Sequence, residues 1–159
     1  MSSLETDRDR RHTAASVLQR IDRETVARLH EYADGGADGI AQRLTELDRE
    51  WDMDRAIELE ASAMGLVGLA LGAFVRPGFL AAPAAIGAAV FLHAMAGWYP
   101  LLPVFRRLGL RTAREIARER YALKALRGDF DGVRQAENRI VAALRAVGGS
   151  LMRGRNGGD

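Results

Sequence analysis

Two long runs of apolar residues without a charged side chain occupy the middle of the chain. The first, Ala61–Val75, has 15 residues, and the second, Phe79–Phe105, has 27. Arg76, Pro77 and Gly78 separate them, and a proline–glycine pair is typical of a turn. This pattern predicts two helices folded back on each other as a hairpin. Each is about long enough to cross the ~30 Å apolar core of a bilayer.

Amphipathic helices are expected before the hairpin. Apolar residues recur at helical spacing within residues 13–32. Ile40, Leu44, Leu47 and Trp51 then follow at spacings of 4, 3 and 4, which puts them on one face of a second helix. Asp52 and Asp54 are candidate N-caps of the first hairpin helix, where an acidic side chain meets the positive end of the helix dipole.

Further helices are expected after the hairpin. Thr112 and Glu115 have the spacing of a capping box, which predicts a helix from there to about Leu126. Residues 133–147 show the apolar pattern of a last amphipathic helix. Because no stretch alternates with a period of two, the predicted fold class is all-α.

These elements divide the chain into four segments. Amphipathic cytoplasmic helices are expected in 1–54, the transmembrane hairpin in 55–105, a basic link with C-terminal amphipathic helices in 106–147, and a flexible tail in 148–159. Residues 1–12 are rich in charge and are expected to be disordered.

Composition adds a charge asymmetry and several exclusions. The net charge of +2 combines a front section, residues 1–60, with nine arginines and 15 acidic residues, and a back section, residues 101–159, with 13 basic and six acidic residues. The chain has no cysteine, which excludes disulfides and thiolate chemistry. Its first residues are polar, so we expect no cleaved signal peptide and regard the hairpin itself as the membrane anchor.

The placement of arginine predicts an orientation. Four of them follow the second apolar run: Arg106, Arg107, Arg111 and Arg114. The connecting turn contains only Arg76. By the positive-inside rule, both termini lie in the cytoplasm and the protein resides in the bacterial inner membrane. Trp98, Tyr99, Arg106 and Arg107 are expected to anchor the hairpin at the inner interface. A soluble helical bundle is the alternative, because helices rich in alanine and glycine also suit a protein core.

Small residues share one face of the first hairpin helix. Ala61, Gly65, Gly68 and Gly72 are spaced 4, 3 and 4 apart, and such a face allows close approach of another helix. The expected partner is the second helix of the same hairpin. A homodimer through this face is the alternative, and we expect the protein to form a homo-oligomer.

Few ionisable residues border the apolar runs. Glu60 lies 17 residues before Pro77 and His93 lies 16 after it, so both fall at nearly the same depth of an antiparallel hairpin. They form a candidate polar pair in which Glu60 either holds His93 protonated or fixes its tautomer. The alternatives are a purely structural hydrogen bond, or a histidine that faces lipid headgroups.

Motifs of catalysis and of metal binding are missing from the sequence. The three histidines lie far apart and lack metal-ligand spacing, and there is no phosphate-binding loop. We therefore expect no catalytic residue, no metal and no cofactor. Basic residues of the C-terminal half alternate with glutamates, as on a solvated helix face, so nucleic acid is not an expected partner.

The hairpin resembles the bacterial inner-membrane YgaP-like transmembrane domain family. The resemblance covers about residues 55–112 and rests on Gly68-Leu-Ala-Leu-Gly72, on Gly97-Trp-Tyr-Pro-Leu-Leu-Pro103 and on Arg107-Leu-Gly109. It implies a two-helix, dimer-prone membrane domain without an established activity. Family members often have cysteine at the position of Tyr99, and some carry a rhodanese domain. This chain has neither feature, which argues against sulfur transfer.

The sequence thus predicts a small integral membrane protein, not an enzyme, that acts as a scaffold or interaction module. Its expected partners are the lipid bilayer, further copies of itself and an unidentified protein bound through the cytoplasmic helices. An accessory role in the transport of small molecules or sulfur species is the alternative from another class.

Overall fold

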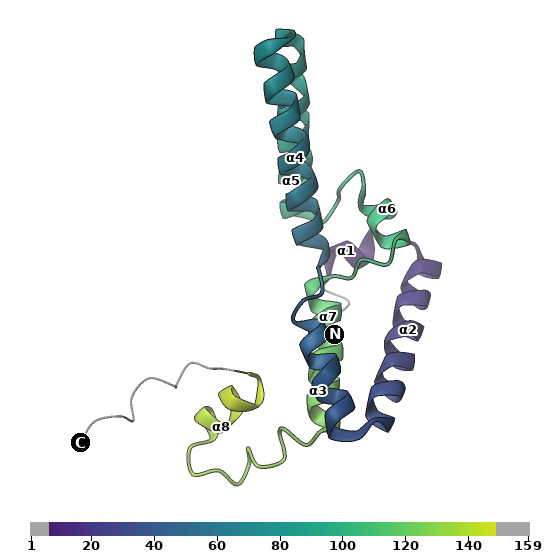
Figure 1. Ribbon diagram of the computed structural model, residues 1–159, viewed down its shortest axis with the longest axis vertical. Coiled ribbons are helices and arrows are strands. Elements are labelled where there is room, and N and C mark those ends of the chain that lie inside the picture. Colours follow the sequence, from purple (N-terminus) through teal and green to yellow (C-terminus); the bar gives the residue numbers. More distant parts are fainter. Residues whose placement is uncertain (1–6, 149–159) are drawn as a thin grey trace, which may run out of the picture. The chain divides into compact units, whose positions relative to one another are not determined.

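The computed structural model describes residues 7–148, and every regular element within that range is helical (Figure 1). The elements are α1 (Arg8–Arg11), α2 (Ala15–Asp34), α3 (Gly36–Leu47), α4 (Met53–Phe74), the 3-10 turn η1 (Pro77–Leu80), α5 (Ala81–Ala96), α6 (Leu102–Arg107), α7 (Ala113–Leu126) and α8 (Arg139–Ala146). The all-α prediction is confirmed for these residues. The tail expected from residue 148 onward lies, apart from its first residue, outside the described range.

The chain divides into two compact units. Within the described range, unit 1 consists of residues 7–25 and 50–116, and it contains α1, α4, η1, α5 and α6. Unit 2 consists of residues 26–49 and 117–148, and it contains α3 and α8. Helices α2 and α7 each contribute residues to both units.

Helices α4 and α5 of unit 1 lie side by side in a hairpin (Figure 1). Asp52 caps α4, since its carboxylate accepts the backbone N–H of Arg55 at 2.8 Å. Pro77 begins η1, where its missing N–H leaves no hydrogen bond unmade. Gly97 ends α5 in the left-handed conformation, with φ of 74°. Both helices are long and apolar enough to cross a membrane when α5 is taken together with η1.

Two glycines of the small-residue face lie at the contact between α4 and the returning chain. A Cβ atom at Gly68 would lie 2.8 Å from Cδ of Pro83, and one at Gly72 would lie 2.5 Å from Cδ2 of Leu80. At Gly65 the same atom would meet nothing within 4 Å. Gly68 and Gly72 therefore pack inside the hairpin, and Gly65 does not.

The base of unit 1 has its own small core. Met53, Ile57, Tyr99 and Leu102 are buried together, and partly buried residues of α5 and α6 cover them. Burial of a side chain of this size typically stabilises a fold by about 1.5–3 kcal/mol. This core holds the first turns of α4 against the segment that follows α5.

A buried ion pair lies beside this core. Arg106 is 1% exposed and donates both terminal nitrogens to Glu115, at 2.7 and 2.8 Å. Burial by itself would raise the pKa of Glu115, but the hydrogen bonds and charge of Arg106 outweigh burial and hold this pKa below its usual value. Glu115 also accepts the backbone N–H of Thr112 at 2.9 Å, and the Thr112 hydroxyl accepts the N–H of Glu115 at 3.2 Å. The predicted capping box is thus confirmed.

The apolar stripe of α3 is buried in unit 2 as its spacing predicts. Ile40, Leu44 and Leu47 are all buried. Trp51 is 45% exposed instead, because α3 ends at Leu47 and the helical register stops there. A fully buried carboxylate, that of Glu119, lies in the same unit and binds Arg43 at 2.7 Å.

Two segments differ from their predicted structure. Residues 8–11 were expected to be disordered but form α1, whose N-cap Asp7 accepts the backbone N–H of Asp9 at 3.2 Å. The last helix begins at Arg139 instead of near residue 133, because Asn138 accepts the N–H of Val141 at 3.1 Å and so caps the helix there.

Candidate functional site

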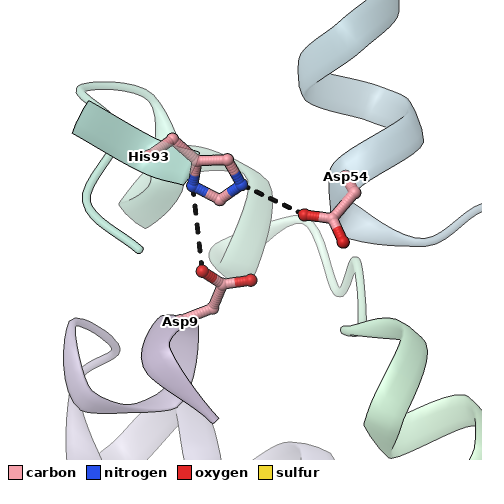
Figure 2. Close-up of side chains that lie close together, drawn as sticks. All are labelled: Asp9, Asp54 and His93. Atoms are coloured by element: carbon pink, nitrogen blue, oxygen red, sulfur yellow. Dashed lines mark hydrogen bonds and ion pairs between the residues drawn. The ribbon is translucent and has the colours of Figure 1, made fainter. Parts of the chain in front are cut away.

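Three ionisable side chains from three separate segments of unit 1 meet at the base of the hairpin. His93 comes from the last turns of α5, Asp54 from the first turn of α4, and Asp9 from α1. Figure 2 shows the imidazole ring between the two carboxylates. One ligand atom from each residue lies within 4.8 Å of the others, as in a potential metal site.

The two nitrogens of His93 have different surroundings. Nε2 lies 3.0 Å from Oδ1 of Asp54 and is hydrogen-bonded to it. Because an ionised carboxylate only accepts, the proton must be on Nε2, and in the neutral ring Nδ1 then carries the lone pair. Nδ1 lies 3.8 Å from Oδ1 of Asp9, which is too long for a hydrogen bond. Within residues 7–148, Nδ1 is the only buried side-chain nitrogen or oxygen without a hydrogen-bond partner.

Contacts between α1 and the end of α5 bring Asp9 to this position. The guanidinium of Arg8 donates to the carbonyl oxygens of Ala94 and Met95. Nε2 of His12 is hydrogen-bonded to the carbonyl oxygen of Ala96 at 3.2 Å. These are the carbonyls that a helix C-terminus leaves without intrahelical partners. The backbone of α1 also approaches Gly97, where a Cβ atom would lie 2.4 Å from Cβ of Arg8. The structure requires glycine at position 97 for two reasons, its positive φ of 74° and this close approach of Arg8.

A cavity of about 410 Å³ opens beside the cluster. Four carboxylate side chains line it, those of Asp7, Asp9, Asp54 and Glu58, together with two arginines, Arg8 and Arg114. Burial raises the pKa of Asp9, and the neighbouring carboxylates of Asp54 and Asp7 raise it further, although His93 acts in the opposite direction. The site therefore has an acidic lining that disfavours further negative charge.

A second polar contact lies one to two turns further along α4. The hydroxyl of Tyr99 donates to Glu60, while the Tyr99 ring stands edge-on to that of His93 with 6.0 Å between centroids. Tyr99 is 4% exposed. Burial, and then the hydrogen bond to Glu60, raise the pKa of its phenol above the usual range.

The predicted partners Glu60 and His93 thus each have another partner. Their depths match, but depth does not fix the direction in which a side chain leaves the helix. Asp54 and Glu60 are six residues apart, so at about 100° per residue they point about 120° away from each other around α4. Asp54 faces His93, and Glu60 faces Tyr99.

The four residues expected at the membrane interface separate into two kinds. Trp98 and Arg107 have exposed side chains, as that role requires. Tyr99 and Arg106 are buried, with 4% and 1% exposure, because the base core and Glu115 enclose them. These two residues stabilise unit 1 and do not face headgroups. Ala61, the last of the predicted packing residues, is 8% exposed.

Sequence reasoning missed Asp9 and Asp54 as neighbours of His93. Asp54 was noted only as a potential cap, and Asp9 lies in a segment expected to be disordered. No sequence spacing connects the three, since 45 residues separate Asp9 from Asp54 and 39 separate Asp54 from His93. The one available signal was that Asp54, at the start of the first hairpin helix, and His93, near the end of the second, fall at the same end of the hairpin.

No protein-family model matches the sequence, and no curated protein and no solved structure is significantly similar to it. The resemblance of the hairpin to the YgaP-like family therefore stays a prediction.

Proposed function

We propose that the protein is a two-pass inner-membrane scaffold whose hairpin spans the bilayer and whose remaining helices lie in the cytoplasm. The observation that carries this proposal is the exposure of the hairpin. Leu66, Phe74 and Phe91 are 67%, 89% and 64% exposed. In the apolar stretch of α4 only 17% of the residues are buried, and in the apolar stretch of Pro77–Ala96 none is buried. A core helix of a soluble bundle would instead be mostly buried, so exposure favours lipid over the soluble alternative.

Elementary energetics support the same reading. Apolar patches larger than a few hundred Å² are rare on soluble monomers and mark membrane or protein contacts. A helix satisfies its own backbone hydrogen bonds, so both helices can enter hydrocarbon without unpaired polar groups. The ionisable residues Asp54, Glu58, Glu60 and His93 all belong to the base of the hairpin. Arg76 stands alone at the opposite end, where it can reach the far interface.

The arrangement of polar groups favours a scaffold over a transport accessory. A transport path needs polar groups distributed through the depth of the membrane. Here residues 61–75 and 79–92 contain no ionisable side chain. Gly68 and Gly72 instead give a close contact between helices. Self-association, as part of this proposal, would use the part of the small-residue face at Gly65, where there is open space.

Alkaline carbonate extraction tests the proposal. The wild-type protein should remain in the membrane pellet and should be released only by detergent. Leu66→Lys places a charge near the middle of α4, which costs about 2.5–3.5 kcal/mol at a helix centre, and should shift protein to the supernatant. Leu108→Lys is a matched control, because Leu108 is 71% exposed but lies outside the hairpin, and it should leave the distribution unchanged. Recovery of the wild type as a monodisperse soluble species would refute the membrane assignment.

A further inference from the structure

We infer that His93 and Asp9 bind a divalent transition-metal ion, with zinc as the type case, and that Asp54 orients the imidazole. This inference does not depend on the proposed scaffold role, because every residue involved lies in unit 1 and its geometry is local. It concerns a site that the spacing of histidines in the sequence does not predict.

One nitrogen of His93, Nδ1, is orphaned in the part of the chain that the structure describes. When the ring is neutral and donates Nε2–H to Asp54, the lone pair of Nδ1 faces the carboxylate of Asp9 at 3.8 Å, so two acceptors oppose each other. Nδ1 is buried and has no hydrogen-bond partner within the described residues. A buried acceptor left without a partner loses the hydrogen bonds that water would have given it, which destabilises the fold. A cation between the two atoms would satisfy both.

The distance between Nδ1 of His93 and Oδ1 of Asp9 is close to the ligand spacing of zinc. Zinc binds histidine nitrogen at about 2.0–2.1 Å and carboxylate oxygen at about 2.0–2.2 Å, so two donors of a tetrahedral ion lie about 3.4 Å apart. The observed separation of Nδ1 and Oδ1 is 3.8 Å. A movement of about 0.4 Å, small for the aspartate side chain, would bring the pair to the ligand spacing of zinc.

The surroundings of His93 and Asp9 also resemble those of a metal site. A histidine ligand that donates its other N–H to a carboxylate is the usual arrangement at protein metal sites, and Asp54 provides that carboxylate. Four carboxylate residues line the adjoining cavity, which has room for water to complete the coordination. The guanidinium of Arg8 is bound to the carbonyl oxygens of Ala94 and Met95 at the end of α5.

The identity of the donors indicates the class of metal. Nitrogen together with carboxylate oxygen suits zinc and its first-row neighbours, whereas magnesium and calcium favour oxygen donors alone. The ion would connect α1 directly to α5, because Asp9 comes from α1 and His93 from α5, and the hydrogen bond between His93 and Asp54 would extend this connection to α4. Binding would therefore hold the N-terminal segment against the base of the hairpin.

Calorimetric titration with zinc chloride tests the site, using the full chain without an affinity tag in detergent at neutral pH. We expect one zinc ion per chain, with no competition from magnesium. Asp9→Asn and His93→Gln should lower the affinity at least about 100-fold. Asp54→Asn should lower it about 10- to 100-fold, the usual effect of losing an orienting partner. His30→Gln and Glu60→Gln are matched controls and should bind zinc as the wild type does.

A second measurement separates loss of the site from loss of folding. Zinc should raise the thermal midpoint of the wild type by mass action, and it should leave that of Asp9→Asn unchanged even though this variant elutes like the wild type. In nitrogen NMR spectra, zinc should move the resonance of His93 Nδ1 and leave Nε2 protonated. Any of four results would overturn the inference. The wild type binds no stoichiometric zinc, or Asp9→Asn and His93→Gln bind zinc as tightly as the wild type does. Alternatively, magnesium competes as well as zinc itself would, or zinc binds through Nε2.

Discussion

At the scale of single residues, Glu60 should be coupled to Tyr99 more strongly than to His93. Tyr99→Phe removes the donor of a hydrogen bond to a carboxylate, a bond of a type worth about 1.5–3 kcal/mol. The cost of Glu60→Gln should therefore shrink by on the order of 1 kcal/mol when it is made in the Tyr99→Phe background. Glu60→Gln combined with His93→Ala should come closer to additivity. Thermal unfolding in detergent of the single and double variants provides both cycles, and the opposite ranking would restore the pair expected from depth.

The observed partners of Glu60 and His93 show what the sequence can say about individual side chains. Counting from the turn gave the correct end of the hairpin for both Glu60 and His93, because depth follows directly from helical rise. It did not give their partners. Those depend on the direction in which each side chain leaves the helix and on α1, which the sequence assigned to a disordered stretch. Asp9 reaches His93 because Arg8 binds the end of α5, and this contact has no local signal.

At the scale of elements, glycine-to-alanine substitutions should distinguish the two kinds of glycine in the hairpin. Gly65 and Gly87 have open space at the Cβ position. Alanine there should be neutral or should stabilise the protein by up to about 1 kcal/mol, the usual helix preference over glycine. Gly68→Ala should destabilise it, because the new methyl would lie 2.8 Å from the rigid ring of Pro83. Thermal midpoints in detergent measure the three changes. A stabilising Gly68→Ala would show that this face is not in close contact.

Two element boundaries were predictable because a capping side chain marks them. Asp52 and the Thr112–Glu115 pair start their helices where the sequence indicates. The last helix was placed too early, since its apolar periodicity extends beyond the point where Asn138 caps the chain. Periodicity reports which face a helix would bury. It does not report where competing hydrogen bonds begin the helix.

At the scale of the whole molecule, the structure changes how the arginine cluster should be read. Arg106 is bound to Glu115, and Arg111 is bound to Glu50 at 2.7 Å. Both arginines are buried. Arg107 and Arg114 are exposed and keep their charge available to headgroups. The excess of positive charge at the base of the hairpin is therefore smaller than the count of arginines suggests, and orientation becomes a property to measure.

Single cysteines in this cysteine-free chain provide that measurement. If the base of the hairpin is cytoplasmic, Gly78→Cys in the turn should react with a membrane-impermeant maleimide in intact spheroplasts. Gly132→Cys, at a position with open space around the backbone, should react only after lysis. Labelling of both variants in detergent shows that each thiol is reachable, so silence in spheroplasts then reports the side of the membrane and not burial. The reverse pattern would show that the protein has the inverted orientation. Other charges would then have outweighed the two exposed arginines in setting it.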